Sequence, residues 1–245
     1  MVLKMMSLVI VISGLFLAQS ASAGEPERVA KARKSAGQKV AKRCKSAGLP
    51  YPPTELLLRA FKDEKVLEIW GNSGAGAAMT KIASFSIAAA SGVLGPKRME
   101  GDRQVPEGIY QISGFNPWSN YHLSMRVNYP NAADRVRGSV AKLGGDIFIH
   151  GNKKSIGCLA MTDPVIDEIY LLCADVVASK GHVAVHIFPG RMSAAWMDNN
   201  LPEHPKWETF WRELQPIYDA FERTRSLPKV KIDRRGAYRL IAPGS

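Results

Sequence analysis

The segment from Ile147 to Asp163, IFIHGNKKSIGCLAMTD, constrains the fold of this chain most strongly. Its first residues are apolar and predict a strand that ends at His150. The next seven residues begin and end with glycine and are mostly polar or basic between them, and Cys158 follows them directly. This loop is long enough to fold back, so we expect it to return the cysteine to the end of the strand that carries the histidine.

Cys158 and His150 are therefore a candidate nucleophile and its base. A thiol attacks a carbonyl carbon as thiolate, and a neighbouring imidazole can take its proton. Gly157 permits a close backbone approach, and we expect Lys153 and Lys154 to favour the ionised sulfur. The alternative is that both residues only pack in the core. The polar loop argues against it, because a packing cysteine there has few apolar neighbours.

The other two cysteines, Cys44 and Cys173, serve as a comparison. An odd number of cysteines leaves at least one thiol free even in an oxidising compartment, and the pairing of Cys44 stays open. A helix is expected from Asp163 to the residue before Gly181, with Asp167 and Glu168 on its solvated side. Its apolar stripe comprises Ile166, Ile169, Tyr170, Cys173 and Val177. Cys173 is thus predicted to be a small core residue.

Residues 1–23 predict a secretory signal peptide: Lys4 precedes an apolar run, and the small residues Ala21, Ser22 and Ala23 form a cleavage pattern. This predicts a periplasmic protein without a stable membrane anchor. Residues 24–53 form a basic N-terminal arm or helix, either solvated or used to dock on an anionic surface. The formal charge of +11 favours polyanionic partners, and export favours wall polymers or acidic lipids over nucleic acid.

Short apolar segments dominate the rest of the chain. Strands are expected at 56–61, 65–71, 81–90, 108–112, 123–127, 146–150 and 182–188, and a helix at about 206–224, followed by a short strand in KVKID or AYRLIA. This order predicts an α+β fold that is mainly β, with a few packed helices. We expect a catalytic domain over residues 54–190 and a C-terminal helical extension over residues 191–245 packed on it.

Metal chemistry and nucleic-acid binding are weaker interpretations. His182 and His186 lie on one predicted strand, and their spacing to the cysteines matches no standard zinc pattern, so we expect no metal. No cofactor motif is present, because the glycine-rich loop 71–76 lacks the ending of a phosphate-binding loop. A polynucleotide partner would rest on charge alone. A non-catalytic wall-binding module is the remaining alternative of another class.

The stretch from about Leu56 to Phe188 resembles the L,D-transpeptidase catalytic domain family (YkuD-like). The resemblance rests on Ile149-His150-Gly151, on Ser155-Ile156-Gly157-Cys158, and on an upstream loop with Gly95-Pro96 and Pro106-Glu107-Gly108. Two departures stand out: Ile156 replaces the usual histidine of the cysteine loop, and the insert before the cysteine is short. With the segments YPN at 129–131 and DR at 134–135, they resemble the YafK-like branch, which is linked to murein L,D-transpeptidase and diaminopimelate-protein amidase activity.

The resemblance implies that Cys158 attacks a meso-diaminopimelate carbonyl of a peptidoglycan stem peptide and forms a thioester, with His150 exchanging protons. It implies roles in cell wall biogenesis and cell shape. The orienting and oxyanion candidates are Gly157, Ser155 and Gly151, and the substrate carboxylate candidates are Arg135, Arg103 and Lys97. The acceptor stays open, so the chain could be a transferase, an L,D-carboxypeptidase, or a hydrolase that releases wall-anchored lipoprotein.

Overall fold

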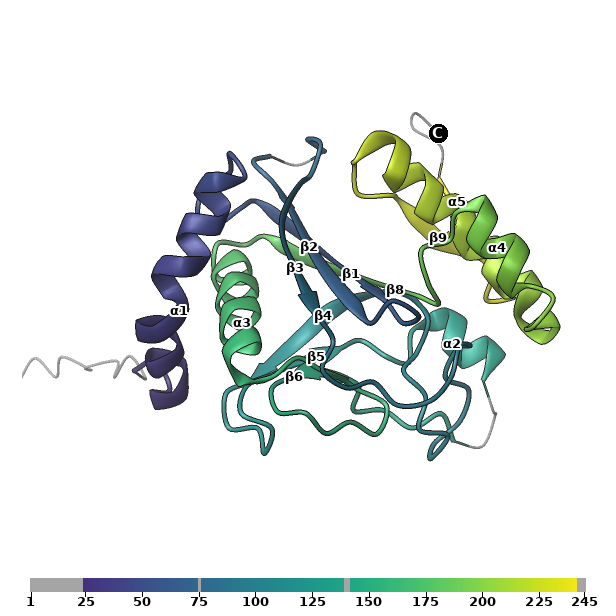
Figure 1. Ribbon diagram of the computed structural model, residues 1–245, viewed down its shortest axis with the longest axis horizontal. Helices are drawn as coiled ribbons and strands as arrows, with labels where there is room; N and C mark the ends of the chain where they lie inside the picture. The colour runs from purple at the N-terminus through teal and green to yellow at the C-terminus, as the bar shows by residue number, and fades with distance from the viewer. Residues whose placement is uncertain (1–23, 75, 139–141, 242–245) are drawn as a thin grey trace, which may run out of the picture.

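A computed structural model describes residues 24–74, 76–138 and 142–241, so the expected signal peptide lies outside the described residues. The fold is a curled sheet with helices on its two faces (Figure 1). The helices are α1 (Glu27–Ser46), α2 (Ala132–Arg137), α3 (Asp163–Ala178), α4 (Ala194–Asn200), the short η1 (Pro205–Trp207) and α5 (Glu208–Thr224). The predicted α+β, mainly β class is confirmed.

The main sheet has the strand order β3-β2-β1-β8-β4-β5-β6-β7. Its strands are β1 (Glu55–Phe61), β2 (Val66–Asn72), β3 (Thr80–Ser86), β4 (Gly108–Asn116), β5 (Ser124–Val127), β6 (Phe148–His150), β7 (Leu159–Ala160) and β8 (His182–Phe188). The strands β9 (Val230–Ile232) and β10 (Tyr238–Leu240) form a separate antiparallel pair. Both short segments proposed for a terminal strand are therefore strands.

The central strands β1 and β8 are apolar along most of their length because both faces of the sheet are covered. They pair in parallel, and six of the seven residues in each are buried. Figure 1 shows α1 and α3 on one side of the sheet and the C-terminal helices on the other. The sheet edge formed by β6 and β7 extends beyond this double cover, and it carries the candidate site.

The helix α3 covers one face of the sheet and buries Ile166, Ile169, Tyr170 and Cys173, as its sequence period predicts. Two parts of that prediction are wrong. Val177 is 42% exposed, and the neighbouring Val176 is buried in its place. Glu168 is buried as well, although it was expected to face solvent.

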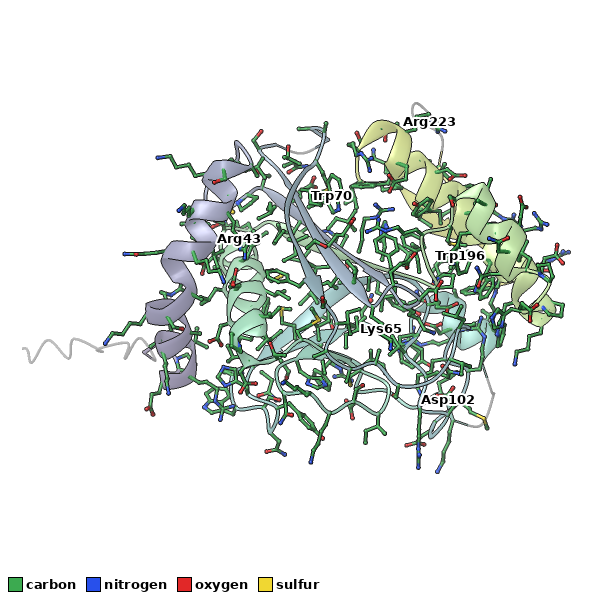
Figure 2. The ribbon with its side chains drawn as sticks, in the orientation of Figure 1. Arg43, Lys65, Trp70, Asp102, Trp196 and Arg223 are labelled. Carbon is green, nitrogen blue, oxygen red and sulfur yellow. The ribbon has the colours of Figure 1, made fainter. Side chains whose placement is uncertain are left out.

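The N-terminal helix α1 is packed against the domain, which corrects the interpretation of a solvated arm. It contacts α3 and buries Val29, Ala32, Ala36, Val40 and Cys44. The small alanines allow close contact between the two helices. Lys39 and Arg43 bind the two oxygens of Glu168 at 2.5 and 2.7 Å, so two cations of α1 neutralise the buried carboxylate. Figure 2 labels Arg43 on α1.

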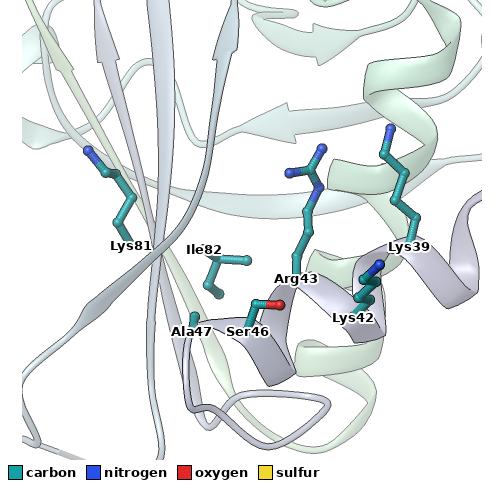
Figure 3. A pocket seen from close by; sticks show the side chains of 7 residues that line it. All are labelled: Lys39, Lys42, Arg43, Ser46, Ala47, Lys81 and Ile82. Carbon is teal, nitrogen blue, oxygen red and sulfur yellow. The ribbon is translucent and has the colours of Figure 1, made fainter.

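A hollow of about 370 Å³ lies between α1 and β3, with Lys42 and Lys81 on its walls (Figure 3). Arg43 and Lys39 also line it, and the ion pairs with Glu168 hold their charges in place. None of the residues that line this hollow belongs to the loop of Cys158. The basic charge predicted for residues 24–53 is thus partly structural.

The C-terminal segment packs on the opposite face of the sheet through α5, whose inner face includes Trp211, Phe221 and Leu214. Arg59 of β1 is fully buried there, and its guanidinium lies 4.3 Å from the Phe221 ring centroid and 2.6 Å from Glu222. Trp70 also meets Phe221, with ring centroids 5.1 Å apart (Figure 2). None of the helices in the described parts of the chain is long and apolar enough to cross a membrane.

Candidate active site

The sheet register places Cys158 and His150 on the same face of neighbouring strands. Strands β6 and β7 are parallel, with Ile149 opposite Leu159 and His150 opposite Ala160. Because side chains alternate along a strand, Phe148, His150 and Cys158 all point away from the buried pair of Ile149 and Leu159. The loop therefore folds back as the sequence predicted. Cys158 directly precedes Leu159, the residue that lies opposite Ile149.

His150 is 2% exposed, and its Nδ1 lies 2.5 Å from the carbonyl oxygen of Gly151. A carbonyl only accepts, so Nδ1 carries the hydrogen and Nε2 keeps its lone pair in the neutral ring. Burial lowers the pKa of His150 below its ordinary value of 6.5, and the Gly151 hydrogen bond opposes that shift. The ring of Tyr121 lies 4.8 Å from the imidazole centroid and partly covers it. At neutral pH the imidazole is therefore a neutral base.

Cys158 is partly exposed, and its Sγ lies 3.6 Å from the carbonyl oxygen of Asp146, to which it donates. Burial raises the pKa of the thiol above its ordinary value of 9.0, and the backbone amide of Phe148 acts against this. Asp146 raises the pKa further and Lys97 lowers it. The expectation that lysines of the cysteine loop favour the thiolate is therefore wrong in detail, since the cation that acts on this sulfur comes from another loop.

Ser155 holds the cysteine loop in a closed turn. Its Oγ donates to the carbonyl oxygen of Cys158 at 2.6 Å and accepts from the Cys158 amide at 3.0 Å. The Cys158 amide is thus engaged within the loop, which leaves the Gly157 amide as the better candidate for an oxyanion donor. Gly157 has φ of 115°, a conformation that glycine adopts without strain. Ser155 and Gly157 therefore lie beside Cys158, and their orienting and oxyanion roles stay predictions.

Gly151 is required by close packing. A Cβ atom there would lie 2.6 Å from Oδ1 of Asp163, 2.9 Å from the Tyr121 carbonyl oxygen and 2.9 Å from Cβ of His122. Asp163 Oδ1 also accepts from the Asn152 amide at 2.7 Å. Any side chain at position 151 would push the carbonyl that orients His150 out of place.

Two of the three expected carboxylate-binding cations lie in the loop that borders Cys158. This loop is attached to the strand after the cysteine, because Ala89 and Ala160 form a β-bridge. Arg103 is exposed. Lys97 is 5% exposed and binds Asp102 Oδ1 at 2.7 Å and the Met99 carbonyl oxygen at 2.8 Å. Lys97 is therefore committed to its own loop and acts on the site through its charge.

Arg135 lies exposed on α2, which packs against the segment around Gly236 rather than against the cysteine loop. Its substrate role stays a prediction. Arg126 was not recognised from the sequence, although it lies opposite Phe148 on the face that carries Cys158. Its partner is Asp146 at 3.5 Å, and both side chains are more than half exposed. Such an exposed pair is weak, so Arg126 can exchange its partner for a substrate carboxylate.

The remaining cysteines and histidines do not join this site. Cys44 and Cys173 are both free and fully buried, and burial raises the pKa of Cys44 to about 11. No cluster of three His, Cys, Asp or Glu residues suited to a metal occurs within residues 24–74, 76–138 and 142–241. His182 and His186 lie on β8, on the side of the sheet that faces the C-terminal segment.

The sheet register brings the strand-borne histidine and the folded-back cysteine loop to one face of the sheet edge, and comparison with known families identifies the class of protein. The family model of the L,D-transpeptidase catalytic domain, YkuD, matches residues 58–187. The chain belongs to the YkuD family of L,D-transpeptidase catalytic domains.

Among curated proteins, the Escherichia coli (strain K12) protein named "Putative L,D-transpeptidase YafK" is 36% identical over 178 residues, which is 71% of this chain and 70% of that protein. Among solved structures, the helical cell shape determining protein Pgp2 from Campylobacter jejuni has a TM-score of 0.45 and 19% identity, with 73% of each chain covered. Bd1075 from Bdellovibrio bacteriovorus has a TM-score of 0.41 and 22% identity, with 69% of this chain and 62% of that chain covered.

Proposed function

We propose that this protein is a cysteine L,D-transpeptidase that acts on meso-diaminopimelate amide bonds of peptidoglycan stem peptides through a thioester on Cys158. The observation that carries the proposal is the placement of Cys158 and His150 on one face of neighbouring strands, with the imidazole hydrogen on Nδ1. Membership of the L,D-transpeptidase family supports a substrate in the peptide part of the wall.

The first half-reaction begins with a neutral thiol and a neutral imidazole, since burial shifts the two pKa values apart. Nε2 of His150 takes the thiol proton as Sγ of Cys158 attacks the carbonyl carbon. The Gly157 amide donates to the oxygen on which charge develops. When the carbon–nitrogen bond breaks, the leaving amine takes the proton from His150, and the acyl group stays on sulfur as a thioester.

The second half-reaction resolves the thioester. An amine of another stem peptide loses a proton to His150 and attacks the thioester carbonyl, and the Cys158 sulfur leaves as thiolate and recovers that proton. Water in place of the amine gives hydrolysis. A protein lysine as the leaving amine of the first half-reaction gives release of a wall-anchored lipoprotein. The chemistry at Cys158 is the same in all three cases.

Incubation of the purified protein with defined muropeptides, followed by mass spectrometry, tests the proposal. We expect an acyl adduct on Cys158 and cross-linked or trimmed products, and both should be lost in Cys158→Ala but retained in Cys173→Ala. One substrate should carry a lysine peptide on diaminopimelate, because its release identifies lipoprotein processing. Full turnover by Cys158→Ala would refute the mechanism, and adduct-free wall binding would favour a binding module.

Export to the periplasm is part of the same proposal. It rests on the sequence of residues 1–23. N-terminal sequencing of the protein recovered from a periplasmic extract should find a chain that begins near Gly24. Recovery of chains that retain Lys4, or recovery only with the cytoplasm, would contradict it.

A further inference from the structure

A second cavity of about 230 Å³ lies between the sheet and the C-terminal segment, and the reaction at Cys158 does not use it. Strands β4 and β8 form its floor, with Gln111, His182 and His186, and the side chains of Leu227, Pro228 and Val230 form its cover. Asn128, next to the end of β5, closes one side. Its volume is below the roughly 300 Å³ at which pockets for drug-sized ligands begin, so it suits one small chemical unit.

The polar groups of this cavity are arranged to donate hydrogen bonds. Asn128 Oδ1 accepts from the backbone N–H of Gln111 at 2.9 Å. The side-chain oxygen Oε1 of Gln111 lies 3.1 Å from Nε2 of His182. Both carboxamide oxygens are therefore engaged. Among the described residues, the NH₂ groups of Gln111 and Asn128 have no hydrogen-bond partner, and an NH₂ group only donates. A ligand that fits must offer a hydrogen-bond acceptor.

His186 gives independent evidence for a ligand. Its side chain lines the cavity and is 1% exposed, and its Nδ1 has no hydrogen-bond partner within the described part of the chain. Buried polar atoms are nearly always paired with protein, water or ligand. Burial, assisted by Arg59, lowers the pKa of His186 to about 3, so the ring is neutral at neutral pH. A neutral imidazole suits an uncharged ligand.

The other lining residues agree with an uncharged ligand. Leu227, Pro228 and Val230 supply an apolar cover, and none of the described residues that line the cavity is an Asp, Glu, Lys or Arg. The cavity thus places amide donors opposite a small apolar surface. An acetamido group, with one carbonyl oxygen and one methyl group, has this complementary shape and polarity.

The cavity also lies within reach of Cys158 on the same face of the sheet. Cys158 neighbours Phe148 across β6 and β7, and Phe148 pairs with Arg126 of β5. Asn128 follows Arg126 by two residues and so points to the same side. Two strand spacings and two residues along a strand amount to about 12 Å. Three to four extended peptide residues span that distance.

We propose that the cavity bounded by Gln111, Asn128, His186 and the apolar cover of Leu227, Pro228 and Val230 binds the acetamido group of an N-acetylated sugar in the glycan strand. The carboxamide groups of Gln111 and Asn128 donate to its carbonyl oxygen, its N–H donates to the unpaired Nδ1 of the neutral His186 ring, and its methyl group packs on Leu227 and Val230. The inference rests on the proposed function, because a stem peptide at Cys158 is attached to such a sugar. The cavity then selects peptides that are still joined to glycan.

Direct binding tests this without turnover. We expect the uncharged disaccharide N,N′-diacetylchitobiose to bind the full chain at least tenfold more tightly than cellobiose, which has hydroxyl groups in place of acetamido groups, measured by calorimetry. Amide chemical shifts should move at Gln111, Ala184 and Val230. Equal binding of the two sugars, shifts confined to other regions, or capture of the sugar-free stem peptide in this cavity would overturn the proposal.

A matched pair of variants sharpens the test. Gln111→Glu keeps an oxygen for His182 but replaces the donor, so binding of N,N′-diacetylchitobiose should fall at least tenfold. Gln215→Glu makes the same change on α5, where Gln215 is half-buried outside the cavity, and should bind as the unaltered chain does. Equal affinity in both variants would overturn the assignment. Sugar binding without acyl transfer would refute the proposed function alone.

Discussion

Nδ1 of His150 lies 2.5 Å from the carbonyl oxygen of Gly151, and this contact fixes the tautomer of the candidate base. The hydrogen must lie on Nδ1, so the lone pair lies on Nε2. Burial in this partly enclosed site lowers the pKa of His150 and raises the pKa of Cys158. The pair is therefore neutral before substrate binds, unlike a preformed thiolate and imidazolium.

The first prediction concerns the pH dependence of the thiol. We expect the rate of Cys158 alkylation by iodoacetamide to rise with pH up to and beyond 9.0, because burial raises the pKa of the thiol above that value. A variant with Cys44→Ala and Cys173→Ala isolates the signal. On the acid side, kcat/KM should decrease with a midpoint below pH 6.5, because burial lowers the pKa of His150 below that value. An alkylation rate that already levels off near neutral pH would show a preformed thiolate.

The second prediction treats Ser155 as a positioning residue. Ser155→Ala removes both hydrogen bonds that Oγ makes to the backbone of Cys158. We expect kcat to fall about 10- to 100-fold with little change in KM, because a small displacement of the nucleophile is costly. Ser155→Thr keeps the hydroxyl and should restore much of the rate. Ser226→Ala, which removes an exposed hydroxyl, is the control. A raised KM with normal kcat would contradict this role.

Much of the fold could be predicted because the central strands are apolar nearly throughout. The segments HVAVHIF and LLLRAF have no helical period and are bounded by polar or turn residues, so each can only be a buried strand. The helices α2 and α4 have six and seven residues, too few for a 3.6-residue period to be visible. The sequence therefore did not predict them.

The docking of α1 could not be predicted because its buried stripe contains mostly alanine and valine. Ala32 and Ala36 bury little apolar area, and hydrophobic patterns give such residues little weight. The contact is favourable because α3 offers the buried carboxylate of Glu168. Whether two helices pack in this way depends on the residues of both, so the sequence of either helix alone does not predict the contact.

Only part of the candidate site could be predicted from the sequence. His150, Cys158 and the glycines between them lie within nine consecutive residues, so local sequence patterns indicated them. Arg126 reaches the site through the pairing of β5 with β6, and Tyr121 contacts His150 from the segment before β5. Nothing in their own sequence neighbourhood marks either residue. The predicted strand at 123–127 would have indicated Arg126 only if its pairing with the strand that carries His150 had been known.

The third prediction follows from the close packing of Gly151. In Gly151→Ala the new Cβ would lie 2.6 Å from Asp163 Oδ1 and 2.9 Å from the Tyr121 carbonyl, so the backbone that orients His150 must move. We expect turnover to fall at least 100-fold while the chain still folds. Gly114→Ala is the matched control, because its Cβ meets nothing nearer than Arg126 at 4.0 Å. Equal activities of the two variants would contradict the argument.

The fourth prediction tests whether α1 is held by its buried ion pairs. Glu168→Gln leaves Lys39 and Arg43 without an anion, and it places an NH₂ group opposite these cations at a residue that is only 4% exposed. We expect the free energy of unfolding to fall by about 1 to 3 kcal/mol, measured by urea titration. Glu208→Gln removes an exposed pair with Arg212 and should change it by less than about 0.5 kcal/mol. Protease cleavage between α1 and β1 should accelerate in Glu168→Gln alone, because the weakened contact lets α1 detach while the sheet stays folded.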